Sequence, residues 1–202
     1  MSKVILVAGM SQNVPVLKGY DYIGIDHGAI SCIKQHIPMV CAVGDFDSVN
    51  DEEKAMIEKA TDIMPLPAHK NDTDTEVAIF YAMEHQYEEI ILYGGLGGRI
   101  DHELANLYLL IHREYPIILM NEQNRIQLLK EGHYKVKKDA YQYLSFLALC
   151  DSCISEENVA YPLSKQEIST KDIYTVSNEI IHEEADITIH KGKVLMIQTR
   201  DA

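Results

Sequence analysis

The chain of 202 residues suffices for one large domain or two smaller ones, and its composition, 47% hydrophobic and 24% charged, is that of an ordinary globular protein. The 31 acidic residues outnumber the 18 lysines and arginines, and the formal charge of -13 argues against nucleic acid or an anionic membrane as a partner. No apolar run approaches the roughly 20 residues that span a bilayer or forms a signal-peptide core, so we expect a cytoplasmic protein.

Up to about residue 120, short apolar runs alternate with helical patterns, which is typical of strand–helix units and a mostly parallel sheet. The expected strands are 4–8, 22–25, 39–43, 62–66, 90–93 and 117–120. The spacing of Thr73 and Glu76 predicts a capping box and a helix through Glu84. A further helix is expected from near Asp101. Its buried face should consist of Leu104, Leu107, Tyr108 and Ile111.

After about residue 122 the apolar pattern changes to a period of two, which indicates antiparallel strands. The expected strands are 125–129, 133–137, 141–149, 173–176, 185–190 and 194–197. The last two should form a hairpin around a turn at Lys191 and Gly192. The predicted fold class is therefore α/β: a mostly parallel, Rossmann-like sheet with flanking helices, followed by an antiparallel β-sandwich or barrel.

Acidic and glycine-rich segments follow the expected parallel strands, where ligands bind in open sheets of this kind. Asp45 and Asp47 are one residue apart, so both carboxylates project to the same side of an extended segment and can approach one hard cation. Mg²⁺ fits best, because it binds one or two carboxylates together with substrate phosphates. The alternative is a turn in which Asp45 and Ser48 cap the following helix. Further acids at neighbouring strand ends favour the metal site.

The segment from Gly94 to Gly98 lacks most side chains, so its backbone N–H groups can approach an anion. The helix expected to follow presents its positive end to the same place, which predicts a phosphate-binding loop. The segment matches neither the Walker A ending nor the GxGxxG spacing. Lys70 and Arg99 are candidates for neutralising phosphate charge, although both are also typical of a solvated surface.

Several of these segments together closely resemble the thiamine pyrophosphokinase family, also called thiamine diphosphokinase. They are residues 26–29, 44–48, 70–76 and 94–107, and the resemblance continues through 161–163 and 177–179. It implies a transferase that moves a diphosphate from ATP to the hydroxyl of thiamine, giving thiamine diphosphate and AMP. It also implies Mg²⁺ as cofactor, ATP as co-substrate and a homodimer whose site is shared across the interface.

The resemblance divides the chain into an α/β catalytic, ATP-binding domain at 1–122 and a β-sandwich for thiamine binding and dimerisation at 123–202. The implied catalytic residues are Asp45, Asp47, Asp74 and Asp101, of which the first three would bind the metal. The implied ATP and phosphate contacts are Asp26, Gly28, Lys70, Thr73, Gly95, Gly98 and Arg99. The implied thiamine contacts are Asp101, His102, Asn106, Tyr161, Ser177 and Asn178.

The chain departs from the family pattern at a few positions. Asn71 stands where the family usually has an acid, with Asp72 one place along, and Met39 replaces another frequent acid. Tryptophan is absent, so Tyr161 is the aromatic residue expected near the thiamine. Two other functions stay open on the sequence: a pyrophosphokinase for another alcohol, such as a hydroxymethylpterin, and a nucleotide-binding sensor without catalysis.

Overall fold

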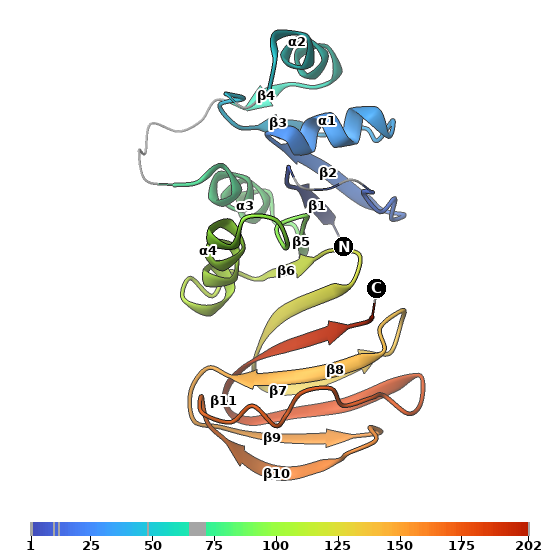
Figure 1. The fold of residues 1–202 in the computed structure, drawn as a ribbon, viewed down its shortest axis with the longest axis vertical. Helices are drawn as coiled ribbons and strands as arrows, with labels where there is room; N and C mark the ends of the chain where they lie inside the picture. Colours follow the sequence, from blue (N-terminus) through green and yellow to red (C-terminus); the bar gives the residue numbers. More distant parts are fainter. Residues whose placement is uncertain (1, 10, 12, 48, 65–71, 202) are drawn as a thin grey trace. The chain divides into compact units, whose positions relative to one another are not determined.

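A computed structural model describes residues 2–9, 11, 13–47, 49–64 and 72–201 (Figure 1). The chain forms two compact units. The first contains Met1–Leu107 and Ile117–Asn121, and the second contains Tyr108–Pro116 and Glu122–Ala202. The chain therefore enters the second unit, returns to the first for one strand, and leaves again. Among the described residues, no helix has both the length and the apolar character needed to cross a bilayer.

The first unit contains a parallel sheet, as expected. In spatial order its strands are β6 (Ile117–Met120), β5 (Glu89–Tyr93), β1 (Lys3–Val7), β2 (Tyr20–Ile25), β3 (Cys41–Val43) and β4 (Ile63–Met64). Each neighbouring pair is parallel. The central strands are apolar and fully buried, as Ile5, Leu6 and Leu92 illustrate. Parallel strands buried on both faces need such continuous apolar runs.

The helices of this unit are α1 (His27–Lys34), α2 (Asp51–Ala60) and α3 (Asp74–Glu84), and α4 (Ile100–Ile111) begins in this unit and ends in the second. The capping box predicted at Thr73 and Glu76 is confirmed, and α3 ends at the expected Glu84. A second capping box, formed by Asn50 and Glu53, starts α2. Gly24 lets α1 lie directly against β2, since a Cβ there would lie 2.4 Å from Cα of Ala29.

The predicted buried face of α4 is partly wrong. Leu104 and Tyr108 are 49% and 55% exposed, whereas the buried residues of the helix are Leu109 and Leu110. The apolar spacing identified a helix correctly, but its period does not reveal which side of the helix the rest of the chain covers. Together with the exposed Ile100, these side chains form an apolar stripe along α4.

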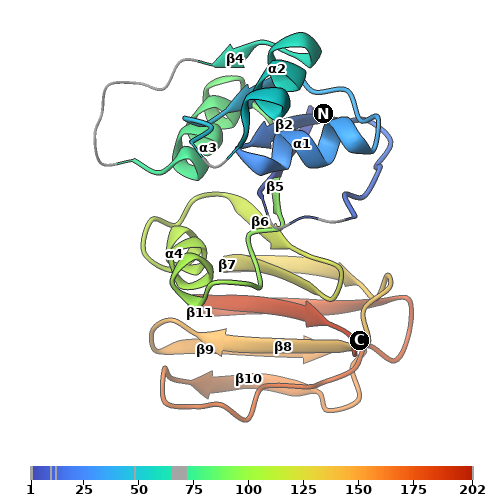
Figure 2. The ribbon, with the colours of Figure 1, turned by 45° about the horizontal axis from the view of Figure 1, so that its top comes forward.

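The second unit is antiparallel, as predicted. Its strands are β7 (Asn124–Lys137), β8 (Tyr143–Ala148), β9 (Ser152–Glu157), β10 (Leu163–Ile168) and β11 (Glu184–Thr199). The long β11 pairs along its length with β7, while its other edge pairs first with β9 and then with β8. Figure 2 shows β9, β10 and β11 running side by side. Phe146, Ile154 and Ile187 belong to one buried core.

The predicted hairpin at Lys191 and Gly192 is wrong, because β11 runs straight through both residues. Gly192 has a φ of +81° and lies where the β11–β7 register shifts, so it marks a bulge rather than a turn. The strand expected at 173–176 is also absent from the described structure. Residues 173–176 instead lie alongside β8 as an irregular segment, and the Phe146 N–H donates to the Thr175 carbonyl at 2.8 Å. Strands β9 and β10 were not predicted.

An ion-pair cluster ties the inserted segment 108–116 to the rest of the second unit. Glu114 pairs with Lys130 at 2.7 Å and also with Lys193. These lysines, Lys130 foremost, lower the pKa of Glu114 to about 2. The segment between α4 and β6 therefore belongs structurally with strands that follow much later in the sequence.

Candidate functional site

Three carboxylates meet at the carboxyl edge of the parallel sheet. Asp26 follows β2, Asp45 follows β3, and Asp74 is the first residue of α3. One oxygen from each lies within 4.8 Å of the others. The three come from segments far apart in the sequence, and the parallel strands bring their ends to one place.

Asp26 is the most confined of the three acids. Its backbone has a φ of +48°, which side-chain-bearing residues rarely adopt, and its N–H donates to the Val43 carbonyl at 3.0 Å. Its Oδ1 atom is buried and accepts no hydrogen bond from the described residues. A Cβ at Gly44 would lie 2.1 Å from this oxygen, so glycine is the residue that leaves the carboxylate room.

Burial and mutual repulsion shift the ionisation of the cluster. Burial, followed by the charge of Asp74, raises the pKa of Asp26 to about 7. Burial is also the largest cause of the raised pKa of Asp74, and the charges of Asp45 and Asp47 add to it. A divalent cation would offset this repulsion and give the buried Oδ1 of Asp26 a partner. An all-oxygen donor set of this kind suits Mg²⁺.

The loop after β3 is anchored by Phe46, a residue outside the predicted site. Its ring is buried in a core cluster that includes Ile30 and Ile57, and its φ is +56°. The Asp47 N–H donates to Oδ1 of Asp45 at 3.1 Å, while the Asp47 side chain is exposed and lies outside the three-carboxylate group. A large apolar residue between two acids is the sequence signal that could have indicated a loop held in place by the core.

The glycine-rich segment after β5 needs its glycines at specific points. Gly94 has a φ of +82°, and a Cβ there would lie 2.0 Å from the Ser11 hydroxyl. Ser11 in turn donates to the Ala8 carbonyl at 3.0 Å, so the loop after β1 packs on this glycine. Asn106 donates from Nδ2 to the Gly95 carbonyl at 2.8 Å. Asn106, expected to contact thiamine, therefore holds the glycine segment.

At the start of α4, Arg99 and Asp101 bind each other. The Arg99 Nε–Asp101 Oδ1 distance is 3.1 Å and the Nη2–Oδ2 distance is 2.5 Å, and both side chains are exposed. This hydrogen bonding with Arg99 lowers the pKa of Asp101 to about 2. His102 is exposed beside them. Arg99, which was assigned to phosphate, and Asp101, which was assigned to thiamine, thus form one ion pair.

Two other predicted ATP contacts have clear structural positions. The Thr73 hydroxyl accepts the Glu76 N–H at 3.2 Å and so caps α3 directly before Asp74. Gly28, the second residue of α1, lies against the end of β1, where a Cβ would lie 1.8 Å from the Val7 carbonyl oxygen. Gly98 has a φ of +83°. Lys70, Asn71 and Ser48 lie outside the described residues.

The second unit groups the other three candidates for thiamine contact. Tyr161 is 74% exposed, and Ser177 is exposed with a φ of +60°. Asn178 is buried, and its side chain hydrogen-bonds to both the N–H and the carbonyl of Tyr161. These three residues are therefore neighbours although 16 positions separate the first two in sequence.

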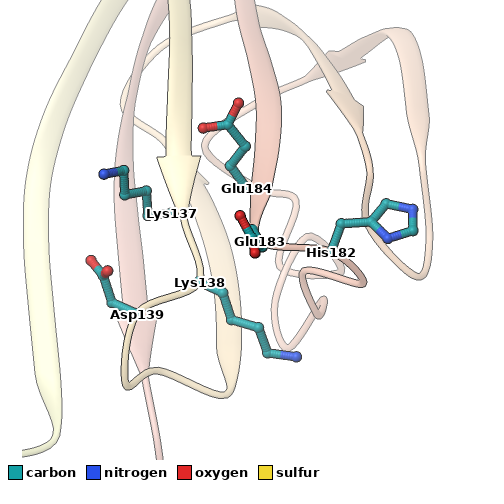
Figure 3. A pocket seen from close by; sticks show the side chains of 6 residues that line it. All are labelled: Lys137, Lys138, Asp139, His182, Glu183 and Glu184. Atoms are coloured by element: carbon teal, nitrogen blue, oxygen red, sulfur yellow. The ribbon is translucent and has the colours of Figure 1, made fainter.

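An open depression of about 430 Å³ also lies in the second unit, near the end of β7 and the start of β11 (Figure 3). Its lining residues are Lys137, Lys138, Asp139, His182, Glu183 and Glu184. Two lysines and three acidic residues line it, so their charges largely cancel. None of the six belongs to the predicted site.

Comparison with known proteins identifies both units. Residues 19–120 match the family "Thiamin pyrophosphokinase, catalytic domain", and residues 133–194 match "Thiamin pyrophosphokinase, vitamin B1 binding domain". The chain is 34% identical over 214 residues to the thiamine pyrophosphokinase of Bacillus subtilis, with 100% of both chains covered.

Solved structures show the same relationship. A thiamin pyrophosphokinase family protein from Enterococcus faecalis is 33% identical, with 100% of both chains covered and a TM-score of 0.88. The thiamin pyrophosphokinase of Candida albicans shares the fold at 16% identity, with a TM-score of 0.76 over 98% of this chain and 89% of that one.

Proposed function

Because the chain belongs to the thiamin pyrophosphokinase family, and is as such a transferase of the thiamine diphosphokinase type, we propose that it transfers a diphosphate from ATP to the hydroxyl of thiamine, releasing AMP. The observation that best supports this reaction is the meeting of Asp26, Asp45 and Asp74 at the edge of the sheet. Carboxylates crowded this closely suit a divalent cation bound together with phosphates.

The three clustered carboxylates would hold Mg²⁺, with Asp47 serving the same ion from the exposed side of its loop. When bound, Mg²⁺ neutralises charge on the phosphate oxygens during transfer. The protein's own part is positioning, since phosphoryl transfer depends mainly on alignment and charge stabilisation. The buried ring of Phe46 keeps Asp45 in place for this task.

The ATP phosphates would lie against the glycine segment that follows β5. The start of α4 carries the positive end of the helix dipole, and the glycines have no side chains that would keep a phosphate away from the backbone. Arg99 is two residues from Asp101 and can exchange that carboxylate for a phosphate, because both offer two oxygens to its guanidinium group.

Asp101 is a poor acceptor for the thiamine hydroxyl proton. Its hydrogen bonding with Arg99 lowers its pKa to about 2, which makes it a very weak base.

On the thiamine side, we propose that Tyr161 and Ser177 face the substrate and that a second copy of the chain completes the site. The exposed apolar residues of the second unit support a protein contact there. They include Ile173, Tyr174, Val176 and Ile181, which flank Ser177 in the sequence.

The test is to incubate the protein with ATP, MgCl₂ and thiamine and to quantify thiamine diphosphate and AMP. Both should form in equal amounts, and both should disappear in Asp47→Asn and in Asp74→Asn. The matched control is Asp51→Asn, because Asp51 is an exposed acid in the first turn of α2. AMP release from both site variants at the wild-type rate, or product with a pterin alcohol but none with thiamine, contradicts the proposal.

A further inference from the structure

A buried carboxyl group stands behind the thiamine-side residues of the second unit. Glu156, on β9, is 1% exposed. Its Oε2 accepts a hydrogen bond from Nδ2 of Asn178 at 2.9 Å. Burial raises the pKa of Glu156 to about 7, with the Asn178 bond acting in the opposite direction. Keeping an acid in this position is costly, so a specific use for it is expected.

The Asn178 side chain uses all of its hydrogen-bonding capacity within the protein. Nδ2 donates to Glu156 and to the Tyr161 carbonyl, each at 2.9 Å. Oδ1 accepts the Tyr161 N–H at 3.0 Å and the Glu179 N–H at 2.9 Å. Two donors and two acceptor sites are the full complement of an amide. Asn178 therefore joins two stretches of backbone and has no polar atom left for a ligand.

The same buried interactions present Ser177 to solvent. The Asn178 backbone pairs in both directions with Leu144, at 2.8 and 3.0 Å, and the Ser177 N–H donates to the Ser145 hydroxyl at 2.9 Å. Ser177 is exposed at the left-handed kink between these contacts. Tyr161, whose N–H and carbonyl both hydrogen-bond to the Asn178 side chain, is also exposed.

A carboxylate behind Asn178 selects one orientation of the amide. If the amide were flipped, Oδ1 would face the Glu156 oxygen and Nδ2 would face two N–H donors, leaving four groups unsatisfied. A carboxylate accepts hydrogen bonds and so requires Nδ2 to point toward it. An apolar residue at this position would leave the orientation to the backbone groups of Tyr161 and Glu179 alone.

We propose that Glu156 is a positioning residue for thiamine recognition: by accepting the Asn178 amide hydrogen, it fixes the amide that holds Tyr161 beside Ser177. This inference rests on the proposed function, and on the thiamine-binding side of it in particular. Glu156 itself does not touch the substrate.

The test compares Glu156→Gln, which retains an acceptor oxygen, with Glu156→Leu, which has similar size and none. Glu156→Leu should raise the thiamine KM about tenfold, with the ATP KM unchanged. Glu156→Gln should restore the thiamine KM to within about twofold of the wild-type value. A merely structural role would lower the thermal midpoint without separating the two KM values.

Wild-type thiamine KM in a folded Glu156→Leu protein overturns the inference while the proposed function stands. Absence of thiamine diphosphate with the wild-type protein overturns both. Should Glu156→Leu fail to fold, Asn178→Ala removes the other partner and should raise the thiamine KM in the same selective way. An unchanged thiamine KM in that variant also overturns the inference.

Discussion

The guanidinium group of Arg99 is bound by the carboxylate of Asp101 through two hydrogen bonds, at the point where α4 begins. The pair is preassembled in a geometry that a phosphate can take over. Arg99→Lys keeps the charge but loses the two-pronged contact, so kcat/KM for ATP should fall roughly tenfold, measured at saturating thiamine. Arg113→Lys, at an exposed arginine of the second unit, is the control. An unchanged kcat/KM in Arg99→Lys contradicts phosphate binding by this residue.

Removal of the most confined acid should stabilise the protein. Because the pKa of Asp26 rises from 3.8 to about 7 on folding, its contribution to stability is present below pH 4 and lost as pH rises to 7. Asparagine does not titrate. At pH 8 the free energy of unfolding of Asp26→Asn should therefore exceed that of the wild type by about 1–2 kcal/mol, after allowance for partial exposure. Denaturant unfolding at pH 5 and pH 8 measures the difference.

Thermal unfolding with and without excess MgCl₂ tests whether Asp26 helps to bind the cation. MgCl₂ should raise the thermal midpoint of the wild type, because ligand bound to the folded state stabilises it. The shift should be smaller in Asp26→Asn. Equal shifts in the two proteins would show that Asp26 does not help to hold the cation.

Gly44 should tolerate no side chain. Gly44→Ala would place a Cβ 2.1 Å from the Asp26 carboxylate, so turnover should fall at least about tenfold and the free energy of unfolding should drop by about 1–3 kcal/mol. Gly19→Ala is the matched control, because Gly19 has a φ of +83° but nothing within 4 Å of the added carbon. Gly19→Ala therefore reports the backbone cost alone. Equal activity in the two variants would contradict the steric argument.

The buried acid of the second unit predicts a pH-dependent stability. The pKa of Glu156 rises from 4.5 to about 7 on folding, so its contribution to stability is present below pH 4.5 and lost as pH rises through 7. Relative to wild type, Glu156→Gln should gain unfolding free energy between pH 5 and pH 8, by up to about 3 kcal/mol. A pH-independent difference in denaturant unfolding would contradict the raised pKa.

The parallel sheet and its acidic edge were predictable because both arise from local patterns. Continuous apolar runs indicated buried strands, and the Thr73–Glu76 capping box located the start of α3 to the residue. Asp45 and Asp74 follow expected strands, so their meeting with Asp26 follows from parallel topology.

Other features depend on contacts that a sequence pattern does not reveal. Lys191 and Gly192 look like a turn, but β7 and β9 pair with the same strand on both of its edges and keep it extended through a bulge. Asn178 was assigned a contact with thiamine, whereas its side chain binds groups of the protein itself. Its role became visible only with Glu156, 22 positions earlier in the chain and buried beneath it.

Residues 108–116 belong to the second unit, and this limits where the chain can be cut when its units are exchanged with those of a relative. A chimaera spliced at residue 122 would carry over β7 and β11 but leave Glu114 behind, so Lys130 and Lys193 would lose their shared partner. A gene fusion that exchanges one unit must therefore also transplant the short segment between α4 and β6. The two units are inherited most safely as a single block, even though each has its own core.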